Sequence, residues 1–424
     1  MARRSTLAGG RSIAGSLAVH QPAIVIDAGA ALLRIGVASE PRPRAVIPTP
    51  VALDPVRLVA VRGFRPTTSE WASLLAPVVD ELLFRHVVVK TKEHPVVVCD
   101  SLLWPHELCE ALAHALFEVA SVPAVAFVPA PLLCVAATGF LTGLAVDVGF
   151  RETRVTPVAE QYPLVGRMRI AAIGATTVAA RLRELLGAAS SDGGGITDAD
   201  VAAITDAELH DAVATLCFVA PRGADTTAMT GSATLDVAAT RGVVRVSRRM
   251  LAEASEALFD GESDAADGRS LASVVLDTLL GCDVDVRPLV IRNIVVTGSL
   301  VGLPGLGARL DMEVRTLCRE QDAYAALRPL LPDLALNAPA CEPWAATWFG
   351  GAAVGGCGAA CIAKWTIPQP SDEDAAVAGS GSTGEAVRSL DWSAVRDVEA
   401  AQEADGAARN ADDPTGARAA SFAS

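Results

Sequence analysis

The chain has 424 residues, of which 51% are hydrophobic, and its formal net charge at pH 7 is −14. This length and apolar content are enough for two domains with hydrophobic cores, which excludes a disordered protein. The acidic balance and the scattered Lys and Arg residues argue against a nucleic-acid footprint, so we expect no DNA or RNA partner. Nine irregularly spaced cysteines without a CxxC pair indicate neither a zinc site nor a disulfide framework, and favour a reduced, intracellular compartment.

The N-terminal residues 1–21 contain Arg and Ser but no acidic residue. Such a composition is typical of an organelle transit peptide or of a disordered extension. We favour the disordered extension, because alanine-rich sequence returns at the other end of the chain.

Residues 23–36, AIVIDAGAALLRIG, predict a β-hairpin whose apolar first strand ends at Asp27 and turns at Gly29. Backbone N–H groups in such a turn can face a phosphate, while the acid can organise a metal ion. Residues 144–153 repeat the apolar strand, the acid and the glycine, as Asp147 and Gly149. Two similar hairpins predict two halves with one cleft between them.

Between the hairpins, strands alternate with helices, which is typical of an α/β fold. Residues 51–71 have strand character, helices are predicted over 71–82 and 107–120, and a strand over 96–101. Residues 119–146 are uncharged and long enough to span a bilayer. Three prolines interrupt them, so we expect a buried strand, turn and helix and no membrane insertion.

The second half also alternates between strand and helix patterns. A strand over 291–297 is predicted to turn at Gly298, and residues 221–245 are predicted to be polar and turn-rich. Residues 371–424 are rich in small and acidic residues and predict a mostly disordered tail, in which 389–396 is a docking element. Helices are predicted over 174–186, 208–219, 270–280, 306–317 and 348–362, and loops over 190–200 and 261–268.

Several separated motifs, taken together, resemble the actin family, and their order and spacing match from residue 23 to residue 365. The motifs are Asp27-Ala28-Gly29 with Arg34 and Gly36, Glu93-His94-Pro95-Val96, Asp147-Val148-Gly149, Ile294-Val295-Val296-Thr297-Gly298 and Trp348-Phe349-Gly350-Gly351. The resemblance implies an α/β, actin-like fold of two ribonuclease-H-like domains around a nucleotide cleft. The first domain would comprise 22–137 plus 346–370, and the second 138–345.

The resemblance also implies a degenerate nucleotide site. Actin's glutamine, histidine and acid for ATP hydrolysis correspond to Ala130, Arg154 and Phe150, none of which can orient a water, so we expect no ATPase activity and no catalytic residue. The adenosine-contacting Lys and Glu of actins are replaced by Val213 and Ala214. These losses leave open whether ATP or ADP is retained as a structural ligand, and no direct metal ligand is assigned. The remaining nucleotide-binding candidates are Asp27, Gly29, Arg34, Asp147, Gly149 and Gly298.

Between Pro48 and Phe84 the chain is much shorter than actins, which build there a second subdomain and the loop that grips the next subunit. A subunit with a truncated second subdomain would accept a neighbour at one end only, which predicts a filament cap. Short motifs at 83–86, 147–152, 277–285 and 391–393 are most similar to the pointed-end actin-related class of dynactin. The expected location is the cytoplasmic cytoskeleton. The expected partners are a filament of actin-related protein 1 and the other pointed-end subunits.

Family geometry places the filament-facing surface at Gly139, Thr142, Gly166 and Trp348, although Trp348 also suits a core or rim aromatic. A nuclear actin-related subunit of a chromatin-remodelling complex is the main alternative function. An enzyme related to sugar kinases is a further alternative, and Glu152 would be its sole candidate base.

Overall fold

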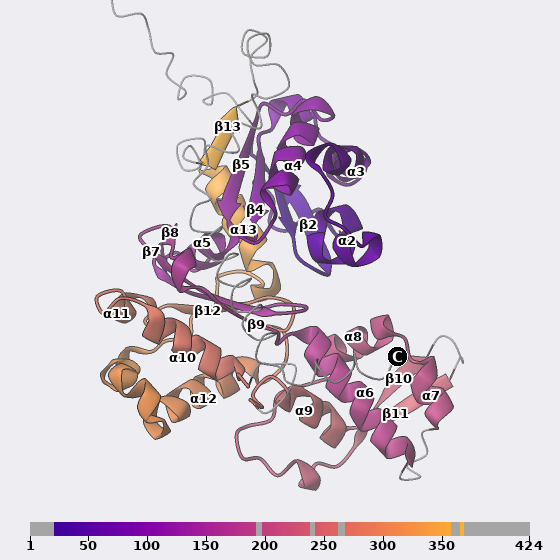
Figure 1. The fold of residues 1–424 in the computed structure, drawn as a ribbon, viewed down its shortest axis with the longest axis vertical. Helices are drawn as coiled ribbons and strands as arrows, with labels where there is room; N and C mark the ends of the chain where they lie inside the picture. Colours follow the sequence, from indigo (N-terminus) through magenta and orange to yellow (C-terminus); the bar gives the residue numbers. More distant parts are fainter. Residues whose placement is uncertain (1–20, 192–196, 238–241, 262–267, 358–364, 369–424) are drawn as a thin grey trace, which may run out of the picture.

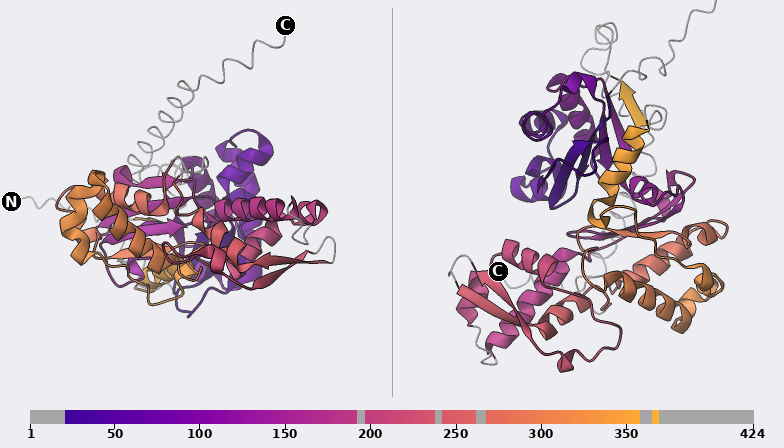
Figure 2. Two further views of the ribbon diagram at one scale, coloured as in Figure 1. Left: turned by 90° about the horizontal axis from the view of Figure 1, so that it is seen from below. Right: turned by 180° about the vertical axis from the view of Figure 1, so that it is seen from behind.

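The computed structural model describes residues 21–191, 197–237, 242–261, 268–357 and 365–368. It has two lobes, each built on a sheet of its own, and they are stacked along the long axis of the molecule (Figures 1 and 2). The predicted N-terminal extension, apart from Gln21, lies outside the described residues. So do the predicted tail 371–424 and its docking element 389–396.

The first lobe contains a six-stranded sheet in which the predicted first hairpin is at the centre. β1 and β2 pair antiparallel, and β1, β4 and β5 run parallel to one another. The strand order is β13 (Thr366–Pro368), β5 (Ala124–Pro129), β4 (Val96–Asp100), β1 (Ile24–Ala28), β2 (Leu32–Val37) and β3 (Ala45–Pro48).

Helices cover both faces of this sheet because its central strands are apolar on both sides. Ile24 and Ile26 of β1 pack with α3 and α4, whereas Val25 faces the opposite side, with α5 and α13. The second of these clusters also contains Ala145 and Val295 of the other sheet, so α5 and α13 fill the junction between the lobes. The helices are α3 (Thr68–Asp80), the π-helix η2 (Glu81–Val87), α4 (His106–Glu118), α5 (Ala130–Ala136) and α13 (Ala346–Gly356).

The strand character predicted for residues 51–71 is wrong, because this segment is helical. It forms the short turn η1 (Val51–Leu53) and then α2 (Pro55–Arg62), before α3 begins. Asp54 caps α2 by accepting a hydrogen bond from the backbone N–H of Arg57, and Pro55 occupies the first helical position. The connection between β3 and α3 is therefore short and contains no strand.

The second lobe contains a five-stranded sheet that begins with the predicted second hairpin. β6 (Gly143–Val148) and β7 (Thr153–Ala159) pair antiparallel, and β12 (Ile294–Thr297) runs parallel to β6. β8 (Tyr162–Pro163) and β9 (Arg169–Ala171) both pair with β7.

The helices of this lobe pack on one another and on the sheet around a single large apolar cluster. α6 continues past the helix end predicted at Gly187, where a side chain would meet nothing within 4 Å, and α8 ends before the predicted Val219. The helical segments are α6 (Ala175–Ser191), α7 (Asp198–Ala203), α8 (Asp206–Thr215), α9 (Arg248–Glu256), α10 (Leu271–Gly281), α11 (Arg287–Val290), α12 (Leu306–Glu320) and the 3-10 segment η7 (Asp322–Asp333).

The prediction that residues 221–245 are turn-rich is wrong in part, because this region contains most of a second sheet of this lobe, which the sequence analysis missed. β10 (Ser232–Val237) and β11 (Gly242–Ser247) form an antiparallel hairpin beside α6 and α8 (Figure 1). Exposed and buried positions alternate along β11, where Val244 and Val246 are buried and Val243 and Arg245 are exposed, as expected for a half-buried strand. Across the described parts of the chain, no helix combines the length and the apolar character needed to cross a bilayer.

Candidate nucleotide-binding cleft

The two hairpins place an acid opposite an arginine in the same way. Asp27 on β1 pairs with Arg34 on β2, and Asp147 on β6 pairs with Arg154 on β7. Arg34 Nη1 donates to Asp27 Oδ2 over 3.2 Å, and both side chains are nearly buried. The structure thus places Asp27, Arg34, Asp147 and Arg154 at the cleft end of the two sheets.

Electrostatics couple the two acids across the cleft. Burial raises the pKa of Asp27 above its usual value, Arg34 lowers it, and the charge of Asp147 raises it. Burial also raises the pKa of Asp147, which Arg154 and Arg34 lower and Glu152 raises. Arg34 therefore acts on both acids, as a cation between two carboxylates would.

The turns of the hairpins are also built alike. The N–H of Gly29 donates to the carbonyl of Leu32, and that of Gly149 to the carbonyl of Glu152, each over 3.0 Å. In the first turn, the N–H groups of Ala30 and Ala31 donate to no other residue in the described ranges. Arg34 is 9% exposed and its Nε likewise lacks a hydrogen-bond partner among these residues. This turn could hold phosphate oxygens, because several donors remain available.

Gly298 directly follows β12 and lies against the second hairpin. Its φ is +102°, and a Cβ there would come within 2.3 Å of the Val148 carbonyl oxygen and 2.6 Å of Asp147 Oδ1. Only glycine suits such a position, because both the backbone conformation and the contact exclude a side chain. Gly298 therefore allows the turn after β12 to approach Asp147.

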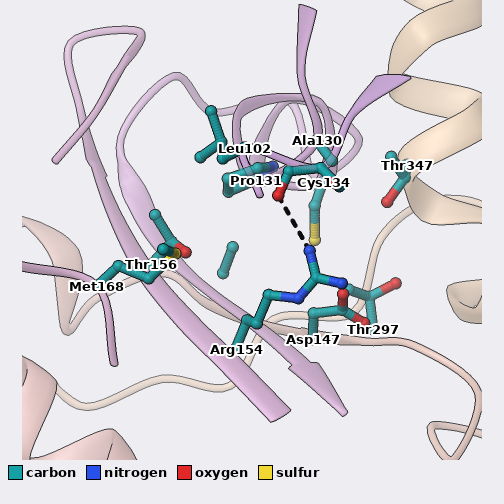
Figure 3. Close-up of a pocket in the computed structure, with 12 residues that line it drawn as sticks. Leu102, Ala130, Pro131, Cys134, Asp147, Arg154, Thr156, Met168, Thr297 and Thr347 are labelled. Atoms are coloured by element: carbon teal, nitrogen blue, oxygen red, sulfur yellow. Dashed lines mark hydrogen bonds between the residues drawn. The ribbon is translucent and has the colours of Figure 1, made fainter. Parts of the chain in front are cut away.

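A small pocket beside the second hairpin is lined by residues of both lobes. It contains two of the three positions at which the resemblance expects actin's catalytic groups to be replaced. Ala130 and Arg154 both line it, together with Asp147 (Figure 3). Arg154 Nη1 donates to the backbone carbonyl of Ser101 in the first lobe over 3.0 Å, and Arg154 also pairs with Glu152 at 2.9 Å. Neither the methyl group of Ala130 nor the engaged guanidinium of Arg154 is a base that could orient a water.

Phe150, the third such position, does not line this pocket. Its ring makes an edge contact with the His210 ring on α8, with 4.6 Å between the ring centroids. Burial lowers the pKa of His210, which favours the neutral ring in this apolar contact. Where the resemblance expects an acid, the chain thus has an aromatic packing contact.

The neighbouring Arg151 links the two lobes directly, and sequence reasoning missed it. Its guanidinium donates through both terminal nitrogens to the carboxylate of Asp54, the residue that caps α2. The Nη1 contact measures 3.1 Å, and Asp54 is buried. The two residues are 97 positions apart, so no local pattern could indicate their pairing.

The purine side of the cleft lacks its expected polar contacts. Val213 on α8 is fully buried in the core of the second lobe, and Ala214 is exposed. Neither can hydrogen-bond a base or a ribose. The cleft residues therefore suit a phosphate group, but they provide no specific recognition of adenosine at these two positions.

Three of the four residues predicted to face a filament lie near one end of the second sheet. Gly139 follows α5 with φ +84°, Gly166 is exposed in the turn after β8, and Thr142 Oγ1 accepts a hydrogen bond from the N–H of Glu160. Beside them are exposed apolar side chains that sequence reasoning did not select, because a chain pattern does not separate surface aromatics from core ones. These are Phe140, Leu141 and Tyr162, each at least half exposed.

The assignment of Trp348 to this surface is wrong. Trp348 is fully buried between the lobes, and its Nε1 donates to the backbone carbonyl of Val25 over 3.3 Å. A buried indole packed against the central strand cannot contact another molecule. Its role is the structural one that the sequence also allowed.

One comparison with known proteins identifies the relationship. A family model described as Actin matches residues 69–193 and 243–365, which together make up more than half of the chain. The matched segments contain the second hairpin, the junction helices α5 and α13, and the turn at Gly298. The two lobes, each built on a sheet that contains one of the hairpins, agree with this match and with an actin-like α/β fold. The chain therefore belongs to the actin family.

Proposed function

We propose that this chain is a non-catalytic actin-related protein, most like actin-related protein 10, that caps the pointed end of the actin-related filament of dynactin. Such a subunit would support dynein-driven transport along microtubules, in the cytoplasmic cytoskeleton. Its partners would be the filament of actin-related protein 1 and the other pointed-end subunits. The observation that carries this proposal is the connection between β3 and α3.

That connection, residues 49–67, is where the resemblance expects the loop that grips the next subunit. Here it is η1 and α2, with Leu53 and Leu58 buried in the first lobe and Asp54 bound to Arg151 of the second. A segment held by two lobes of its own chain cannot reach into a neighbouring subunit. This arrangement supports the proposal that growth does not continue beyond this end.

The surface around Gly139, in contrast to this buried connection, exposes side chains that a neighbouring subunit could contact. Phe140, Leu141 and Tyr162 expose apolar side chains beside Thr142 and Gly166, and the backbone N–H of Gln161 donates to the carbonyl of Leu141, which holds the two loops together. Exposed aromatic residues on a rigid support are typical anchors of protein interfaces. We call Phe140, Leu141 and Tyr162 the aromatic end, and propose that it contacts the last subunit of the filament.

Single-filament fluorescence with filaments of purified actin-related protein 1 tests the proposal. The protein should stop growth and shortening at pointed ends without binding filament sides. The double variant Phe140→Asp, Tyr162→Asp should weaken capping by roughly thirtyfold or more, because the loss of one interface anchor alone costs about 2 kcal/mol. Val243→Asp, an exposed apolar position on β11, is the matched control. Binding along filament sides, or continuous polymerisation, would refute the proposal.

Co-purification from cells distinguishes this proposal from the chromatin-remodelling alternative. Dynein and dynactin subunits should accompany the tagged protein, and recovery of a helicase-type ATPase would favour the nuclear function instead. Acid extraction of the purified protein then tests for ATP or ADP as a structural ligand. If nucleotide is present, Arg34 and the first hairpin turn would hold its phosphates, whose negative charge these donors match.

A further inference from the structure

The Arg34 side chain contains a buried donor that the fold leaves unpaired. Arg34 is 9% exposed, and its Nη1 donates to Asp27. Its Nε is buried as well, but has no hydrogen-bond partner among the described residues. A buried donor without an acceptor is unfavourable, and more so when it carries charge. An oxygen of a phosphate group at this edge of Arg34 would remove that cost, so Nε supports a phosphate site together with the N–H groups of Ala30 and Ala31.

The indole of Trp344 covers the same guanidinium. Arg34 Cζ lies over the Trp344 ring, 5.2 Å from its centroid, which is a cation–π contact. Because Nε belongs to the same planar group, the ring shields it on one side. Asp27, the other group in contact with the guanidinium, is 8% exposed, whereas Trp344 is 37% exposed. Of these two neighbours, the indole is therefore the one that can move into water without opening the core.

Trp344 is attached to the second lobe, so its contact with Arg34 crosses the cleft. It lies in the 3-10 turn η8 (Pro343–Ala345), which precedes α13. The Oγ1 of Thr297, the last residue of β12, donates to the carbonyl of Pro343 over 2.8 Å and fixes this turn to the sheet of the second lobe. Arg34 belongs to β2 of the first lobe. The indole thus joins the sheet of one lobe to the hairpin of the other.

We propose that Trp344 is a lid on Arg34 and thereby regulates the phosphate site. In its closed position, the indole stacks on the guanidinium and links the two lobes. Because Nε is buried in this arrangement, a phosphate oxygen can reach it only after a covering group has moved, and Trp344 is the partly exposed one. Binding of a phosphate group therefore releases the indole from Arg34 and weakens this contact between the lobes. The inference rests on the proposed phosphate site, and it does not depend on filament capping.

The charges near Arg34 determine which probe suits the site. Arg34 acts electrostatically on both Asp27 and Asp147. These two carboxylates would repel a bare phosphate anion, whereas an anion that carries Mg²⁺ brings positive charge with it. Inorganic pyrophosphate in magnesium buffer is therefore the probe, and it contains neither base nor ribose. Its binding reports on the phosphate contacts alone.

Isothermal titration calorimetry of the full-length protein with this probe tests the lid. Trp344→Leu should bind pyrophosphate roughly tenfold more tightly than the parent, because the anion no longer competes with a cation–π contact. The matched control is Phe218→Leu. It removes a similar contact, in which Arg248 Cζ lies 4.7 Å from the centroid of the Phe218 ring, between α9 and the segment after α8. The affinity of this control should equal that of the parent.

Trp344 fluorescence provides a second readout. In the parent, pyrophosphate should shift the emission to longer wavelength as the indole enters water, and Trp344→Leu, which keeps the other tryptophans, should not show the shift. Equal affinity in the parent and in Trp344→Leu would overturn the lid and leave the phosphate site standing. If neither protein binds pyrophosphate, the phosphate site and the lid both fail. ATP should show the same roughly tenfold gain in Trp344→Leu; a loss of ATP affinity there would assign the indole to the base and refute its role as a lid.

Discussion

The bridge between Asp54 and Arg151 should stabilise the closed arrangement of the two lobes. Replacing Arg151 by Met leaves a carboxylate that is 3% exposed with only the cap bond from Arg57. Removing one partner of a fully buried pair costs about 3–5 kcal/mol. Because the Arg151 side chain is itself 30% exposed, water can compensate in part, and we expect a loss of about 2–3 kcal/mol in unfolding free energy.

A double-mutant cycle isolates the interaction from the cap. Asp54→Asn keeps an oxygen that can accept the Arg57 N–H, so the cap is preserved while the charge is lost. Urea unfolding of the two single variants and of the double variant should give a coupling energy of about 2 kcal/mol. The open lobes of Arg151→Met should also enlarge the radius of gyration in small-angle scattering.

The matched control is an arginine–aspartate pair on the surface. Arg292 and Asp333 are joined by a 2.7 Å contact, but both side chains are about half exposed. Their coupling should be below about 1 kcal/mol and should fall with added salt. If Asp54 and Arg151 couple no more strongly than this pair, the bridge does not hold the lobes and our reasoning fails.

Three further predictions concern the cleft. Gly298→Ala should destabilise the protein by about 3 kcal/mol or more in urea unfolding, because it combines strain at positive φ with a Cβ overlap, whereas Gly302→Ala, where nothing lies within 4 Å, should cost less than about 1 kcal/mol; equal effects would contradict this account. Burial raises the pKa of Asp100 to about 6, above its ordinary 3.8, so its folded form holds the proton longer and its contribution to stability falls as pH rises between about 4 and 6. The variant Asp100→Asn should therefore match the parent near pH 4 and exceed it by about 2–3 kcal/mol near pH 7, and a constant difference across this range would refute the assignment. In a phosphate-release assay, the purified protein should show no sustained ATP turnover, because Ala130 and Arg154 cannot orient a water; turnover above a protein-free control would show that other groups do so.

Much of the fold follows from local pattern. The alternation of apolar runs, acids and glycines predicts both hairpins, and within each hairpin the register places Asp27 opposite Arg34 and Asp147 opposite Arg154. Residues 51–71 were predicted wrongly, because Val and Leu favour strands as readily as short helices there. The Asp54 cap and the proline at the first helical position decided the outcome.

What the sequence by itself determined is the pair of hairpins, since each depends on residue types at short, fixed spacings. Tertiary structure alone decided that Trp348 is buried, that Arg151 reaches Asp54, and that Phe140 and Tyr162 share one exposed surface. Burial and ion pairing depend on which distant segments meet. No local sequence pattern indicates a contact between two residues that are 97 positions apart.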